Sequence, residues 1–243
     1  MNALTALIIL LILFFPTTST AAGTEIKLPE EGFFQSDFED LSRQIGIAIS
    51  YAPLAPAEPL GIIGFDVGIE VTAVDIDQDE SFWTSAVGET PPSYLVIPKI
   101  HAQKGLPFGF DVGLEYAKAP GTNIGFIGGE LKWAFIKGGM AIPSVALRGS
   151  YTQLLGVDDL DLKTYGVDLS ISKGFGFLTP YAGVGQIWIS SREKSDVINL
   201  DKENPSLTKG FIGLKVTIFV FSFVAEADFA EIPLYHLRAN LSL

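Results

Sequence analysis

The sequence predicts an all-β protein, a transmembrane antiparallel up-and-down β-barrel of about ten strands, with twelve as the alternative count, preceded by a short amphipathic helix. Two observations lead to this fold class. Segments of membrane-spanning length alternate between apolar and polar residues, and no apolar run after residue 23 is long enough for a transmembrane helix. Because only helices and closed barrels satisfy every backbone polar group in lipid, such a chain crosses a membrane as a barrel.

The beginning of the chain has the composition of a signal peptide. Residues 3–15 are almost all apolar, a stretch too short to cross a bilayer, and small residues follow as far as Ala21 and Ala22. We expect cleavage near Ala22, which makes 1–22 the predicted signal peptide and the outer membrane the predicted location. An uncleaved anchor is the alternative, because no Lys or Arg precedes the apolar run.

Residues 23–61 form a predicted periplasmic or plug segment. Apolar residues at helical spacing predict an amphipathic helix over 36–51, with Ser36 as its cap and Glu39 three residues later. The same stretch also fits a strand, so an additional strand is the alternative. A helix is favoured because a further strand would put the N-terminus outside the cell. We expect the helix to lie on the inner membrane interface or to plug the barrel, with a Pro-rich link over 53–59 after it.

Alternation with a period of two residues defines the barrel, 62–243. In the segment 108–117 every second residue from Phe108 to Tyr116 is apolar, whereas Gly109, Asp111, Gly113 and Glu115 fill the positions between. A soluble β-sandwich or barrel would also alternate, but aromatic residues near segment ends and small residues on the polar face favour a membrane barrel. The predicted strands are 62–76, 94–104, 108–117, 123–136, 142–153, 160–173, 179–191, 207–218, 221–229 and 234–243.

The connections between these segments predict the orientation of the barrel. Those near 105–107, 137–141 and 174–177 are short, whereas 76–93 and 192–206 are long and polar. Membrane barrels have short periplasmic turns and longer external loops, so the first strand, 62–76, is expected to run outward.

The signal peptide, the strand pattern and the C-terminus together resemble the small outer-membrane β-barrel proteins of Gram-negative bacteria. In that group the last strand carries an insertion signal with alternate apolar residues, which Tyr235, Leu237 and Leu241 match, although Leu243 stands where an aromatic residue is usual. The resemblance implies two partners, outer-membrane lipids and the barrel insertion machinery, the latter through 234–243.

The polar face predicts a lumen lined with charges of both signs. If neighbouring charges pair, the narrow interior is closed; if they do not, it is a small selective pore. The predicted lumen-facing residues are Asp66, Glu70, Lys99, His101, Asp111, Glu115, Glu130, Lys132, Arg148, Asp168, Lys209, Lys215, Glu226, Asp228, His236 and Arg238.

Composition excludes several classes of function. The chain has no cysteine, and its formal net charge of −12 argues against a nucleic-acid partner. With His101 and His236 as the only histidines and no HExxH motif, we expect no catalytic, cofactor-binding or metal-binding residues. The expected function is that of a non-enzymatic outer-membrane barrel, structural or a narrow small-solute channel. The alternatives are a lipid-active barrel enzyme and a soluble periplasmic barrel that binds an apolar ligand.

Overall fold

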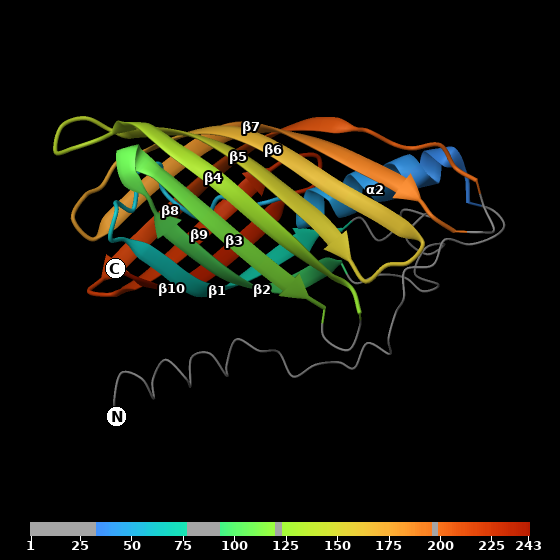
Figure 1. Ribbon diagram of the computed structural model, residues 1–243, viewed down its shortest axis with the longest axis horizontal. Helices are drawn as coiled ribbons and strands as arrows, with labels where there is room; N and C mark the ends of the chain where they lie inside the picture. The colour runs from blue at the N-terminus through green and yellow to red at the C-terminus, as the bar shows by residue number, and fades with distance from the viewer. Residues whose placement is uncertain (1–32, 77–92, 120–122, 196–198) are drawn as a thin grey trace, which may run out of the picture.

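The computed structural model describes residues 33–76, 93–119, 123–195 and 199–243 (Figure 1). The predicted signal peptide and its cleavage site lie outside these residues, as does most of the long connection 76–93. The elements are α2 (Gln35–Ile49), β1 (Phe65–Asp75), β2 (Tyr94–Gly105), η1 (Pro107–Gly109), β3 (Phe110–Lys118), β4 (Gly125–Lys137), β5 (Ser144–Leu155), β6 (Leu160–Ser172), β7 (Leu178–Glu193), β8 (Ser206–Ile218), β9 (Phe221–Phe229) and β10 (Leu234–Ser242).

The ten described strands close into one antiparallel barrel, in which each strand pairs with its neighbours in sequence and β1 pairs with β10. This confirms the predicted up-and-down barrel and the lower of the two strand counts. Tight turns join β2 to β3, β4 to β5, β6 to β7 and β8 to β9 at the end that also holds the C-terminus, which we call the short-turn end. The ends of β1 and β2 at Asp75 and Tyr94, and those of β7 and β8 at Glu193 and Ser206, lie at the opposite end, which we call the long-loop end.

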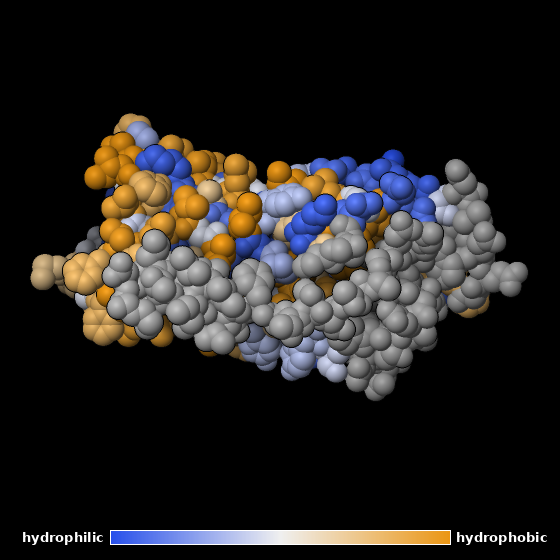
Figure 2. All heavy atoms as spheres, turned by 90° about the horizontal axis from the view of Figure 1, so that it is seen from below, coloured by the Kyte–Doolittle hydropathy of each residue, from blue (hydrophilic) through white to orange (hydrophobic). Residues whose placement is uncertain are grey.

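The barrel is apolar outside and polar inside, which is the reverse of a soluble protein. Leu131 is 50% exposed and Leu169 46% exposed on the outer wall, whereas Lys132 and Arg148 are 1% exposed on the inside. Figure 2 shows hydrophobic residues gathered over the short-turn half of the surface and hydrophilic ones toward the long-loop end. Such an apolar outer band around a closed barrel is what contact with lipid requires.

Aromatic side chains mark the two borders of this apolar band. Tyr116, Tyr165, Trp188 and Tyr235 are exposed on the outer wall nearer the long loops. At the short-turn end the exposed aromatics include Phe108, Phe175, Phe177 and Phe219, all in turns. Two such rings are typical of the interfaces on either side of a bilayer.

Helix α2 is seated in the long-loop mouth of the barrel, at the end opposite the C-terminus (Figure 1). Its apolar face, with Phe38, Leu41 and Ile45, is buried against inward-facing apolar residues of the wall such as Leu162 and Ile189. This packing explains why the apolar face of 179–191 is ambiguous in the sequence, since Ile187 and Ile189 point inward to meet the helix.

The predicted amphipathic helix is thus confirmed, but its predicted cap is wrong. The helix begins at Gln35, and the carboxylate of Asp37 accepts the backbone N–H of Phe34 at 2.8 Å, so Ser36 lies within the first turn. None of the described helices is long and apolar enough to cross a membrane.

Candidate functional site

The interior of the barrel gathers the charged residues that the sequence places on its polar face. Lys215 is half-buried, with 14% of its side chain exposed, and the other fifteen predicted lumen-facing residues are buried. They come from nine of the ten strands and reach inward because alternate side chains of a strand point to the same face. The structure therefore brings these residues into one enclosed space.

Most of the charges pair along the wall, between neighbouring strands. The Lys132 ammonium lies 2.9 Å from Asp111, and Arg148 Nε lies 2.9 Å from Glu130 and 4.0 Å from Asp168. Other neighbouring-strand pairs join Lys99 to Glu70 and Glu115, Lys209 to Asp228, and Arg238 to Glu70. One pair reaches further, because Lys215 of β8 contacts Asp66 of β1 at 3.3 Å, past the two strands between.

The chain between α2 and β1, residues 51–61, runs through the lumen, and we call it the luminal segment. It leaves the helix at the long-loop end and joins β1 at the short-turn end. At roughly 3.3 Å per extended residue, eleven residues are enough to traverse the apolar band of a membrane barrel, about 25 Å tall. Helix α2 and the luminal segment together, residues 33–61, are called the plug below.

Charged side chains of the wall bind the backbone of the luminal segment. Lys132 donates to the carbonyl oxygens of Pro56, at 2.9 Å, and Glu58, at 3.1 Å. Arg238 donates to the carbonyls of Pro53 and Leu54, and Lys209 to that of Tyr51.

Side-chain oxygens of the wall also accept hydrogen bonds from backbone N–H groups of the luminal segment. The N–H of Leu54 donates to Glu226 at 3.0 Å, that of Glu58 to Ser172 at 3.2 Å, and that of Leu60 to Asp111 at 3.1 Å. The wall thus meets both kinds of main-chain group, which is what a peptide needs when it is buried away from water.

The sequence of the luminal segment suits this position. Pro53, Pro56 and Pro59 have no N–H, so three donors that would need partners in the lumen are absent. Leu54 has a φ of 43°, a left-handed conformation that costs a non-glycine residue of order 1 kcal/mol. Its N–H is bound by Glu226 and its carbonyl by Arg238, so the wall holds the kink in place.

One small cavity lies beside the plug. A cavity of about 10 Å³ lies between Tyr51, Ser150, Asp168 and Lys209, which is room for about one water molecule. A Cβ at the inward-facing Gly113 would lie 2.8 Å from the Tyr51 hydroxyl, so the absence of a side chain there makes room for the plug. The plug and the wall fit closely.

The two histidines serve the interior in different ways. His101 Nε2 is 3.0 Å from the hydroxyl of Tyr51, and its ring also contacts Arg238, so it belongs to the surface that binds the plug. His236 Nδ1 lies 2.8 Å from the Thr72 hydroxyl.

Several residues of this site are not apparent from sequence alone. Tyr181 donates to Glu226 at 2.6 Å, and Leu54, Tyr181 and Phe211 pack together inside the barrel. The sequence does contain one indication of this packing, because large apolar residues such as Phe126 and Phe211 occur on an otherwise polar face. Those positions predict that something apolar fills the lumen.

No protein-family model and no curated protein sequence matches this chain. Among solved structures, it is similar to the outer membrane protein OprG from Pseudomonas aeruginosa, with 10% identity and a TM-score of 0.37 over 78% of this chain and 99% of that one. It is also similar to the N-terminal β-barrel domain of Pseudomonas aeruginosa OprF, with 16% identity and a TM-score of 0.34 over 73% and 97% of the two chains.

A third similar structure is Ail, the attachment invasion locus protein of Yersinia pestis, in complex with the heparin analogue sucrose octasulfate. It has 10% identity and a TM-score of 0.33, over 74% of this chain and 97% of that one. The likeness to these outer-membrane proteins is one of barrel architecture and does not extend to a ligand or an activity.

Proposed function

We propose that this protein is a non-enzymatic outer-membrane β-barrel whose own N-terminal plug closes the lumen, so that it acts as a structural barrel and not as an open channel. The observation that carries the proposal is the binding of the luminal segment by the wall. Charges that would line a pore instead hold the backbone of 51–60, through Lys132, Arg238 and Asp111 among others.

The strength of this closure follows from the type of contact. Hydrogen bonds to charged groups contribute roughly 1.5–3 kcal/mol each, more than neutral ones, and several of them act on one short segment. Helix α2 adds an apolar contact at the long-loop mouth, where Phe38 and Leu41 are fully buried. Both ends of the plug are therefore attached, one by polar and one by apolar contacts.

The outer wall supports a membrane location over a soluble ligand-binding barrel. A soluble barrel would expose polar residues to water and keep its apolar face inside, around an apolar ligand. Here the exposed residues in the middle of β6 are Val167 and Leu169, whereas the inward-facing Asp168 and Ser170 of the same strand are buried. The outer membrane is the proposed location because it is where closed barrels of this kind reside.

One arrangement inside the barrel resembles a catalytic one and bears on the lipid-enzyme alternative. A hydroxyl, an imidazole and a carboxylate follow one another at Thr72, His236 and Asp228, with His236 Nε2 3.8 Å from the Asp228 carboxylate. All three side chains are buried on the inside, where a membrane lipid cannot reach the Thr72 hydroxyl. This burial favours a non-enzymatic role.

Conductance in planar lipid bilayers tests the proposal. The full chain, shown to be folded by heat-modifiable gel migration, should give no stable single channels, because the lumen is filled. A variant that lacks residues 33–60, folded by the same criterion, should give discrete channels. Stable channels from the unaltered protein would refute the closed barrel and would favour a narrow solute channel instead.

A further inference from the structure

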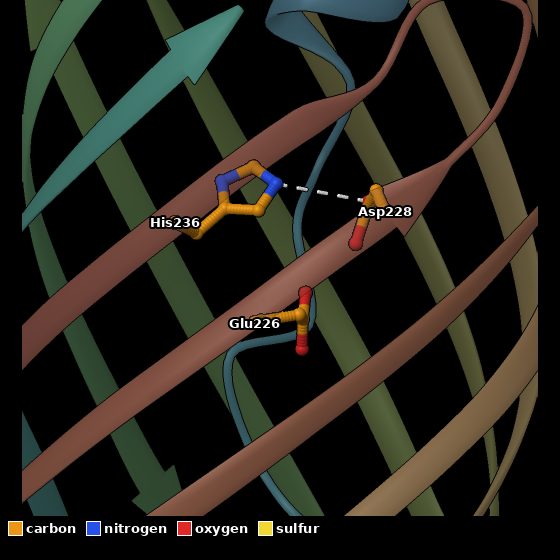
Figure 3. A group of neighbouring side chains, drawn as sticks. All are labelled: Glu226, Asp228 and His236. Atoms are coloured by element: carbon orange, nitrogen blue, oxygen red, sulfur yellow. Dashed lines mark ion pairs between the residues drawn. The ribbon is translucent and has the colours of Figure 1, made fainter.

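Three side chains of the types that bind metal ions meet on the inner face of the β9–β10 hairpin (Figure 3). His236 of β10 pairs directly with Glu226 of β9, and Asp228 lies two residues further along β9 on the same face. One donor atom from each of the three lies within 4.8 Å of the others, and all three residues are buried. We call them the hairpin triad.

Each member of the triad has one atom bound by the surrounding structure and one atom free. Glu226 Oε2 accepts from Tyr181 and from Leu54 N, Asp228 Oδ2 accepts from Lys209, and His236 Nδ1 contacts Thr72.

The remaining atoms, Glu226 Oε1, Asp228 Oδ1 and His236 Nε2, are buried without a hydrogen-bond partner. In Figure 3 the imidazole points its Nε2 toward the Asp228 carboxylate, with Glu226 below them. An unpartnered buried donor or acceptor is costly, so one on each of three neighbouring side chains indicates a missing partner.

The charge balance of the lumen indicates that this partner is a cation. The predicted lumen residues comprise eight carboxylates and six cations, which leaves two negative charges when both histidines are neutral. Among these eight acids, only Glu226 forms no ion pair with another described residue. The unbalanced carboxylate thus belongs to the triad, beside a second carboxylate.

We propose that Glu226, Asp228 and His236 bind a divalent transition-metal ion of the Zn²⁺ type inside the barrel. One imidazole nitrogen with two carboxylates is a ligand set that suits such an ion, whereas Ca²⁺ takes six to eight oxygen ligands and Mg²⁺ prefers oxygen. With its proton on Nδ1, next to the Thr72 oxygen, His236 presents the Nε2 lone pair to the metal.

The spacing of the donor atoms fits such an ion after a small movement. Ligands about 2.1 Å from a tetrahedral zinc ion lie roughly 3.4 Å apart. His236 Nε2 is 3.8 Å from Asp228 Oδ2, the oxygen that also accepts from Lys209, and one donor atom of each residue lies within 4.8 Å of the others, so side-chain rotations would have to bring the donors closer by up to about 1.4 Å.

Such an ion would also join the wall to the plug. Glu226 would use one oxygen for the metal and the other for the N–H of Leu54, so the ion and the luminal segment would share one carboxylate. The bound metal would tie β9 to β10 and fix the Glu226 side chain that holds the kink at Leu54. Two histidines and no HExxH motif predict no metal site. The proposed ligands instead come from two neighbouring strands, β9 and β10, and so form no local sequence motif.

Metal binding by the folded protein tests the site. The full barrel, stripped with a chelator in detergent and shown to be folded by heat-modifiable migration, would be titrated with Zn²⁺ by equilibrium dialysis and elemental analysis. We expect one ion per chain, and at least a tenfold weaker affinity in Glu226→Gln, Asp228→Asn and His236→Gln. The control is Glu115→Gln, which removes another buried lumen carboxylate outside the triad and should leave zinc binding unchanged.

Two further results would separate a true site from surface binding. Co²⁺ in place of Zn²⁺ should give a visible absorption spectrum that is lost in His236→Gln, because the imidazole is a direct ligand. Absence of stoichiometric zinc in the folded unaltered protein would overturn the proposal. Equal zinc affinity in the folded triad variants and in Glu115→Gln would overturn it as well.

Discussion

Replacement of Lys132 by methionine would test most directly whether the wall holds the plug. The Lys132 ammonium donates to two carbonyl oxygens of the luminal segment, those of Pro56 and Glu58, and pairs with Asp111. Methionine is similar in size and uncharged, so Lys132→Met would remove the two hydrogen bonds while filling nearly the same volume. We expect the balance between the plugged and the open lumen to shift toward the open form.

The size of the effect follows from the lost contacts. Two hydrogen bonds from a charged donor contribute roughly 3–6 kcal/mol. The lower value applies here, because water that enters an open lumen would hydrate the ammonium of the unaltered protein. A loss of about 3 kcal/mol raises the ratio of open to plugged molecules by roughly a hundredfold.

Single-channel recording would measure this ratio, with Lys99→Met as the matched control. Lys99 is also a buried lysine, and among the described residues its ion pairs are with the wall carboxylates Glu70 and Glu115. Both variants should lower the barrel's resistance to urea, because each leaves a buried carboxylate without its partner. Only Lys132→Met should show frequent openings. Equal opening of the two variants, or silence of both after folding is verified, would refute the idea that Lys132 holds the plug.

Three other changes probe the helix, the lumen and the wall. A Cβ at Gly46 of α2 would lie 2.7 Å from Ile189 Cγ1, so Gly46→Val should loosen the helix and speed amide hydrogen exchange over 35–49, whereas unchanged exchange would contradict the packing. Tyr51→Phe should remove the hydrogen bond to His101 and make channel openings more frequent, and unchanged opening would argue against a role of this contact in holding the plug. Leu169→Arg on the outer wall should destabilise the barrel in lipid by about 2–4 kcal/mol in urea titrations, whereas Thr208→Arg, nearer the long loops, should cost much less, and equal costs would count against a lipid-facing Leu169.

Alternation in the sequence was enough to predict the barrel wall. The pleat of a strand sends successive side chains to opposite faces, so the pattern from Phe108 to Ala117 separates lipid-facing from inward-facing residues without knowledge of the neighbouring strands. The predicted and observed strand bounds agree within about three residues. The helical spacing of apolar residues likewise predicted the helix, although it did not predict that the helix begins at Gln35.

The contents of the lumen depended on the tertiary structure. Lys132 binds both Asp111 and the luminal segment. These contacts depend on the register between strands and on the path of residues 51–61, and neither produces a periodic pattern in the sequence. The same holds for Glu226 and His236, which are ten residues apart and meet only because the hairpin places them opposite each other.

By itself, then, the sequence determined which side chains face lipid and which face inward, because that property repeats along each strand. Only the closed barrel decided that several of the inward charges bind the chain's own backbone as well as one another. The physical reason is that a buried charge is costly unless an opposite charge or a hydrogen-bonding group lies next to it. Which group lies next to it depends on distances in the folded chain.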